Sequence, residues 1–251
     1  MDKWKYFDIT HQHHVCLNPM LPEKFDRFIQ LLQLESGKSV LDIACGNGEF
    51  LLSLAKAYQI SGTGIDLSPY FIAKAQASKL DRLPEADLKF IELDGAEFKP
   101  EKPHSFHLAA CIGASWIFGG HAGTLDALIE LVEPGGWVIV GEPFWLQTPA
   151  DDYLEASEIS RNEFGTHYQN VKVAEEKGLN LVHTFMSTLD EWDMYEGLKW
   201  LATDEYARTH PDDPDLPEIL DKVAVEKEIY LKWGRDSMGW AIYLFRKPFT
   251  A

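Results

Sequence analysis

The feature that most constrains the fold is a regular alternation of short apolar segments with amphipathic helical segments up to residue 143. The apolar segments are rich in branched residues, as in strands buried on both faces of a sheet. They cover residues 39–44, 61–68, 88–94, 106–113 and 137–143. Apolar residues recur at helical spacing in residues 22–34, 48–59, 69–80 and 124–132. This alternation predicts an α/β fold, with a mostly parallel sheet covered by helices on both faces.

The remaining hundred residues are less regular. Residues 153–178 have a helical pattern that is interrupted near Gly165 and stops at Gly178. Residues 179–188 and 238–247 alternate as two further strands, and the segment between them has the pattern of two helices joined by "HPDDPDLP". If these strands are antiparallel neighbours, the helical insertion leaves from the end of the sheet where ligands bind in open α/β folds.

Composition narrows the class of partner. The chain has 251 residues, 40 acidic against 23 basic side chains, and a net charge of -17, which argues against nucleic-acid and anionic membrane partners. Three cysteines, no apolar leader at the start and no apolar stretch of membrane-spanning length predict a cytoplasmic protein. The oligomeric state stays open.

The sequence "VLDIACGNGEF" (residues 40–50) carries the first binding motif. A strand turns straight into a helix there, and Gly46 and Gly48 have no Cβ to keep a ligand away from the backbone. A dinucleotide site expects a third glycine where Leu51 stands, and a phosphate loop expects Lys-Ser/Thr in place of Glu49-Phe50. The flanking acids, Asp42 and Glu49, favour a cationic or zwitterionic ligand.

Two more acids follow the next two strands. Asp66, in "GTGIDLS", is placed to accept hydrogen bonds from ribose hydroxyls, and Asp94, in "LDGAEF", from an exocyclic amine such as that of adenine. Ribose, adenine and a charged amino acid are the parts of S-adenosylmethionine (SAM).

These motifs resemble those of the class I SAM-dependent methyltransferases, over most of residues 38–146, with Ala44 in place of the usual first glycine. "LVEPGGWVIVGEPFW" resembles the stretch leading into their fifth strand. The segments "CIGASWIFGG", "GEPFW" and "EWDMYEGLKW" are most similar to bacterial small-molecule methyltransferases related to the ubiquinone/menaquinone-biosynthesis type. The resemblance implies a Rossmann-like sheet of seven strands, the last antiparallel, and SAM as cofactor.

The resemblance also implies roles for individual residues. Gly46 and Gly48 would contact the methionine part of SAM, with Asp42 near its ammonium group. Asp66 would bind the ribose hydroxyls and Asp94 the adenine amine. Each acid has a structural alternative as a helix cap or turn residue, and the glycines as ordinary turn residues.

Three further positions follow from the resemblance. Leu67 and Gly95 would flank the adenine ring, with Cys111 or Ile112 beneath the cofactor. A small core residue is the alternative for Cys111. The whole chain would be one methyltransferase domain, with an N-terminal helical segment (1–36), a SAM-binding core (37–150) and a helical cap (189–236).

The acceptor should enter beside the fourth and fifth strands, beneath the N-terminal segment and the late insertion. Aromatic side chains there could hold a planar or cationic substrate, or could simply pack a lid. The candidates are Trp116, Trp145, Trp192 and Tyr195. The candidate acid–base residues are His14, His121 and Glu142. The alternatives are an entrance residue or an ordinary surface histidine for His14, a helix start for His121 and a helix cap for Glu142.

No metal site is expected. "HQHHVCLNP" offers His11, His13, His14 and Cys16 without a carboxylate-rich or second cysteine pair, and "HPDDPD" lacks the spacing of a calcium loop. The sequence therefore predicts methyl transfer from SAM to a small molecule. "CIGA" after the fourth strand, where nucleic-acid amino-methylating enzymes carry N/D-P-P-Y/F/W, argues against a nucleic-acid acceptor. A non-catalytic module that binds SAM or S-adenosylhomocysteine, and a nicotinamide-dependent oxidoreductase, remain as alternatives.

Overall fold

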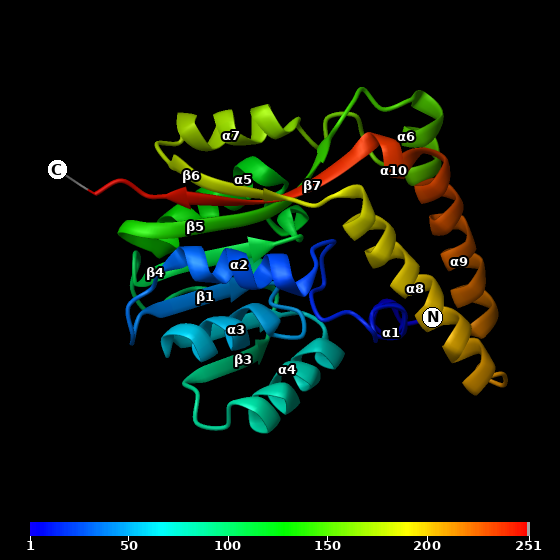
Figure 1. The fold of residues 1–251 in the computed structure, drawn as a ribbon, viewed down its shortest axis with the longest axis horizontal. Helices are drawn as coiled ribbons and strands as arrows, with labels where there is room; N and C mark the ends of the chain where they lie inside the picture. Colours follow the sequence, from blue (N-terminus) through cyan, green and yellow to red (C-terminus); the bar gives the residue numbers. More distant parts are fainter. Residues whose placement is uncertain (250–251) are drawn as a thin grey trace.

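The computed structural model describes residues 1–249 and contains one seven-stranded sheet with helices on both faces (Figure 1). The strand order is β3-β2-β1-β4-β5-β7-β6. Strands β1 to β5 pair in parallel, and β7 is antiparallel to both of its neighbours. The strands are β1 Ser39–Ile43, β2 Ser61–Asp66, β3 Leu88–Glu92, β4 Phe106–Ile112, β5 Val132–Trp145, β6 Asn180–Met186 and β7 Met238–Arg246. The predicted Rossmann-like fold with an antiparallel last strand is confirmed.

Helices α2 Pro22–Leu32, α3 Glu49–Tyr58 and α4 Pro69–Arg82 pack on one face of the sheet, and α5 His121–Leu131 and α7 His167–Glu176 pack on the other. The apolar positions of α2 are buried as their helical spacing predicts, and Phe28 stacks on Phe50 of α3 with ring centroids 5.5 Å apart. The Ser68 hydroxyl caps α4 by accepting from the Phe71 N–H, directly before Pro69.

Two elements begin three or more residues before the predicted start. The strand expected at residues 137–143 runs from Val132 to Trp145. Val132 still pairs with Phe106 of β4, and the "EPGG" segment lies within an irregularity of the register in which Gly135 has φ +79°. The predicted helix at 124–132 starts three residues earlier, at His121. The expected interruption near Gly165 is present, and it separates α6 Asp151–Ser157 from α7.

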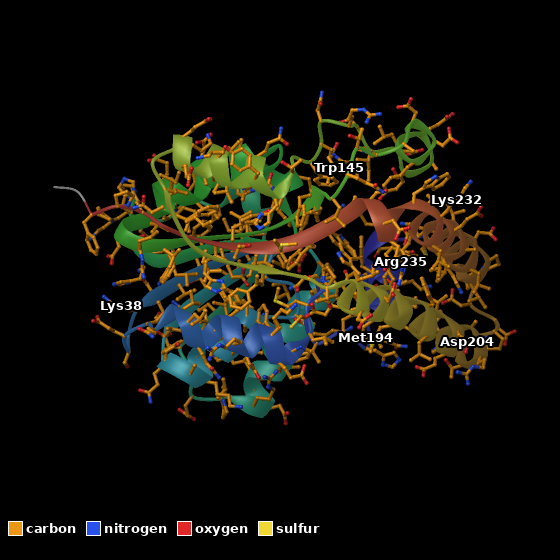
Figure 2. All side chains as sticks on the ribbon, turned by 45° about the horizontal axis from the view of Figure 1, so that its top comes forward. Lys38, Trp145, Met194, Asp204, Lys232 and Arg235 are labelled. Carbon is orange, nitrogen blue, oxygen red and sulfur yellow. The ribbon has the colours of Figure 1, made fainter. Side chains whose placement is uncertain are left out.

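A helical cap stands beyond the carboxyl ends of the parallel strands (Figure 1). It consists of α1 Lys3–Thr10, α8 Leu189–Thr209, α9 Leu216–Ile229, a π-helical turn Tyr230–Gly234 and α10 Arg235–Ser237. Figure 2 shows Met194, Asp204 and Lys232 at this end and Lys38 at the opposite end. The Lys5 ammonium pairs with Asp213 and Asp215 at 2.8 and 2.7 Å, and these ion pairs tie α1 to the chain between α8 and α9. Within residues 1–249, no helix is both long and apolar enough to cross a bilayer.

Candidate functional site

A cavity of about 580 Å³ lies between the carboxyl ends of β1–β4 and the cap. Its sheet side is formed by the turn after β1, the end of β2, the start of the 3-10 turn Gly95–Glu97, and the segment from Ile112 to Ile117. Its cap side is formed by α1, residues 16–18, and Tyr195 of α8. This volume lies in the range of small-molecule binding pockets.

The glycine turn has the backbone conformation that the sequence requires. Gly46 and Gly48 have φ of +54° and +81°, and Ala44 at φ +59° occupies the left-handed region although it carries a Cβ. Gly46 lines the cavity, and a Cβ there would come within 2.5 Å of Leu17 Cδ1. Gly48 does not line the cavity. A Cβ at Gly48 would lie 2.8 Å from the Phe90 ring, so its glycine allows close packing of α3.

The three predicted acids all line the cavity. Asp42 is only 3% exposed, and its Oδ1 finds no hydrogen-bond partner in the part of the chain that the structure describes. Burial raises the pKa of Asp42 well above its usual value, and the neighbouring Asp66 raises it further. A buried carboxylate oxygen without a partner fits a ligand that donates hydrogen bonds and carries positive charge.

Asp66 and Asp94 also hold the local backbone. Asp66 accepts from the N–H of Gly46 at 2.9 Å and of Ser68 at 2.8 Å, and burial raises its pKa. Asp94 Oδ1 accepts from the Ala96 N–H at 2.9 Å and caps the 3-10 turn. The capping alternative is therefore realised for Asp94, and Asp66 holds two turns of the backbone; both positions also line the cavity.

The second acid beside the glycine turn, Glu49, is paired with an arginine. Glu49 lines the cavity, but its two carboxylate oxygens accept from the Arg82 guanidinium at 2.5 and 2.9 Å. Of the two acids that flank the turn, only Asp42 is therefore without a cationic partner among residues 1–249.

The remaining cofactor-side positions divide between the two faces of the sheet. Leu67, Gly95 and Ile112 line the cavity. Cys111 is fully buried in the core on the α5 face and does not line it, so of the pair Cys111 and Ile112 only the second reaches the cavity. Adjacent strand residues point to opposite faces, which explains the difference.

Two of the four aromatic acceptor candidates line the cavity. Trp116 lines it with 71% of its surface exposed, and Tyr195 lines it from α8. Trp145 does not: its indole N–H donates to the Arg161 carbonyl at 3.0 Å (Figure 2 labels it near α6). Trp192 packs behind Tyr195, with ring centroids 6.3 Å apart, and also lies outside the lining.

None of the three acid–base candidates lines the cavity. His14 is buried against Tyr195 and contacts its backbone carbonyl at 2.9 Å. His121 and Glu142 lie on the face covered by α5. His121 Nε2 is 3.0 Å from the Asn170 carbonyl, and Glu142 accepts from the Ser115 hydroxyl at 3.0 Å. Burial raises the pKa of Glu142 to about 7. Its side chain points to the α5 face, as does that of Val140 two residues before it.

Helix α1 supplies cavity residues that the sequence analysis did not identify. They are Lys3, Trp4, Phe7 and His11. The helix has almost no amphipathic pattern, so its sequence does not predict a cavity wall. Of these four residues, only His11 was named from the sequence, as a possible metal ligand in "HQHH". His13 of that run instead pairs with Glu205 of α8 at 2.6 Å. Among residues 1–249, no three or more His, Cys, Asp and Glu side chains are grouped to hold a metal ion.

Comparison with known proteins identifies the family. The family described as "Methyltransferase domain" matches residues 40–136. A SAM-dependent methyltransferase from Thiobacillus denitrificans, solved in complex with S-adenosyl-L-homocysteine, is 34% identical, with a TM-score of 0.88 and coverage of 98% of this chain and 99% of that chain. YjhP of Escherichia coli (strain K12) is 31% identical over 245 residues, which is 97% of this chain and 98% of YjhP. A ubiquinone biosynthesis O-methyltransferase of Chromobacterium violaceum is 29% identical over 138 residues, 55% of this chain and 54% of that protein.

The chain therefore belongs to the class I SAM-dependent methyltransferases, and the predicted family is confirmed. Within this class, the T. denitrificans methyltransferase and YjhP match over nearly the whole chain. The ubiquinone-biosynthesis relative matches over about half of each chain. The cap is thus shared with the full-length relatives.

Proposed function

We propose that the chain transfers the methyl group of SAM to a nucleophilic atom of a small molecule bound between the glycine turn and the cap. The observation that carries this proposal is that Oδ1 of buried Asp42 has no hydrogen-bond partner among residues 1–249, in a cavity whose wall is opened by Gly46. An ammonium group of an amino acid ligand would satisfy that oxygen. The cavity volume and its largely apolar wall suit a cofactor together with a small acceptor.

The chain's own residues would hold the cofactor along the sheet edge. Asp42 and Gly46 would contact the methionine part, and Asp66 and Asp94 the ribose and adenine. When bound, SAM would supply a methyl group on a positively charged sulfur. The acceptor's nucleophilic atom would take this methyl group, and S-adenosylhomocysteine would be the leaving group. The cap contributes by excluding water and by aligning the acceptor, which is the main requirement for an already activated methyl group. Asp66 is held in place by two backbone N–H groups, so the turn and the ribose position are coupled.

Charge and thiol content support a small-molecule acceptor in a reducing compartment. A net charge of -17 disfavours contact with a phosphate backbone. All three cysteines are buried free thiols, as is usual for cytoplasmic proteins. The named O-methyltransferase relative acts in ubiquinone biosynthesis, which is consistent with a small acceptor.

Calorimetry with SAM, S-adenosylhomocysteine and NAD tests the proposal. We expect both sulfur compounds to bind and NAD not to bind, since the turn lacks the third glycine of a dinucleotide site. Incubation with methyl-labelled SAM and a metabolite extract should then transfer label to a small molecule. Binding of NAD, or no binding of either sulfur compound, would refute the proposal. Cofactor binding without labelling of any metabolite would instead favour the non-catalytic binding module.

A further inference from the structure

Two cavity-lining side chains from distant parts of the chain meet at the cap side of the site. His11 ends helix α1, and Tyr195 lies in the second turn of α8. The Tyr195 hydroxyl oxygen is 3.0 Å from His11 Nε2. Nothing in the reaction described above assigns a role to this pair.

The surroundings of His11 fix which atom donates in this hydrogen bond. His11 Nδ1 lies 3.1 Å from the Phe7 carbonyl, which can only accept, so Nδ1 carries the hydrogen. The neighbouring Thr10 hydroxyl, 2.9 Å from Nδ1, gives its own hydrogen to the Tyr6 carbonyl at 2.9 Å. It therefore leaves Nδ1 as the donor.

The imidazole is also neutral. Burial, together with His14 and Lys199, lowers the pKa of His11 to about 3. A neutral ring with hydrogen on Nδ1 presents a lone pair at Nε2. The Tyr195 hydroxyl must therefore donate its hydrogen to His11 Nε2. Toward any other group, the Tyr195 oxygen can act only as a hydrogen-bond acceptor.

His14 fixes the same tyrosine from the other side. Its Nε2 lies 2.9 Å from the Tyr195 carbonyl, so Nε2 carries the hydrogen and donates. The two ring centroids are 4.6 Å apart, and the His11 and His14 rings are 4.8 Å apart. Burial also lowers the pKa of His14 below its usual value. Tyr195 is thus held through both its backbone and its hydroxyl by two neutral histidines of opposite tautomer.

We propose that Tyr195 is the residue that recognises the acceptor, by taking a hydrogen bond from a hydroxyl or amine proton on a planar small molecule, while His11 is a positioning residue. This inference rests on the proposed function. The planar body of the acceptor is inferred from the aromatic cavity residues Trp4, Phe7 and Trp116. The proton-bearing group is inferred from the Tyr195 hydroxyl, which already donates its hydrogen to His11 and can therefore only accept from the acceptor. Lys3 in the same wall argues against a cationic acceptor.

The hydrogen-bond arrangement can be tested without any substrate. In protein labelled with nitrogen-15 histidine, long-range proton–nitrogen spectra should show His11 as the neutral Nδ1–H tautomer until the pH approaches about 3. Tyr195→Phe should shift the His11 Nε2 resonance. Tyr206 lies elsewhere on α8, and its hydroxyl donates to Asp213. Tyr206→Phe should leave the His11 Nε2 resonance unchanged. A His11 resonance of the Nε2–H tautomer, or one that Tyr195→Phe does not move, would overturn the proposal.

Acceptor recognition is tested with matched probe pairs in protein saturated with S-adenosylhomocysteine. The pairs are phenol with anisole, and aniline with N,N-dimethylaniline, followed by ligand-detected NMR. We expect the proton-bearing member of at least one pair to bind about tenfold more tightly, the value of one good hydrogen bond. Tyr195→Phe should abolish this preference and Tyr206→Phe should keep it. His11→Gln, which retains an acceptor near Nε2, should preserve it better than His11→Phe.

The outcomes separate this inference from the proposed function. Failure of S-adenosylhomocysteine to bind contradicts the proposed function itself. Cofactor binding with no preference within either pair, with a preference that survives Tyr195→Phe, or with no binding of any probe, contradicts only the role of Tyr195.

Discussion

Replacing Asp42 with asparagine should make the free protein more stable and its cofactor binding weaker. Asp42 is buried, its Oδ1 has no partner within residues 1–249, and its folded-state pKa is raised well above the usual value by burial and by Asp66. The unfolded chain loses this proton near pH 4, whereas the folded chain retains it to higher pH. Stability therefore falls as the pH rises above about 4, because the folded state binds more protons.

The size of the effect is bounded by the pH interval. If Asp42 stays protonated in the folded chain at pH 7, the penalty reaches about 4 kcal/mol, at 1.36 kcal/mol per pH unit. Asparagine has nearly the same shape and no charge, so Asp42→Asn should gain about 1–4 kcal/mol at pH 7 and almost nothing at pH 4. Loss of a charge-assisted hydrogen bond to the ligand ammonium should weaken S-adenosylhomocysteine binding by about 10- to 100-fold.

Urea unfolding followed by circular dichroism across this pH range measures the first effect, and titration calorimetry measures the second. Asp81→Asn, at an exposed position on α4, is the matched control and should change stability by no more than about 0.5 kcal/mol. A gain at pH 7 that persists unchanged at pH 4 would refute the buried-charge argument. Unchanged cofactor affinity would refute the ammonium contact.

Three other substitutions probe the turn, the core and the α5 face. Ala44→Gly should raise the free energy of unfolding by about 0.5–1 kcal/mol in urea titrations, because relief at φ +59° outweighs the added chain entropy. Phe28→Ala should cost about 3–5 kcal/mol by the same measurement, since the ring is fully buried. His121, whose pKa burial lowers to about 4, stays neutral when folded but is protonated when unfolded below about pH 6.5. Wild type should therefore lose about 2–3 kcal/mol relative to His121→Gln between pH 7 and pH 4.5, and parallel stability curves would contradict this.

The fold, and the meeting of the three acids at one cavity, could be predicted from sequence because both depend on local patterns. Alternating strand and helix periods determine a parallel sheet, and a parallel sheet brings the residues after β1, β2 and β3 to one edge. Asp42, Asp66 and Asp94 therefore meet at the cavity although the chain separates them by more than twenty residues each time. The extension of β5 could not be predicted, because "EPGG" is typical of a turn.

Residues near the ends of β4 and β5 were harder to assign to the cavity. The position of a residue along a strand does not say to which face of the sheet its side chain points. Cys111 and Glu142 lie at the correct end of the sheet, yet both belong to the α5 face. The face depends on where the strand's alternation starts, and β4 is apolar on both faces from Leu108 to Ile112, so it carries no alternation from which the face could be predicted. Ile112 directly follows Cys111, so its side chain points to the opposite face of the sheet and reaches the cavity.

The acceptor side depends on contacts that no local pattern encodes. His11 and Tyr195 are 184 residues apart. Helix α1 is held to the rest of the cap by the ion pairs of Lys5, and its Tyr6 and Ile9 pack against α9. Without its partner, a histidine in "HQHH" is interpreted as an ordinary surface residue more readily than as a metal ligand. With the partner in place, burial keeps the imidazole neutral, and the tautomer decides the direction of the Tyr195 hydrogen bond. The cofactor can therefore be inferred from local motifs, whereas the acceptor must be inferred from how the two ends of the chain close over it.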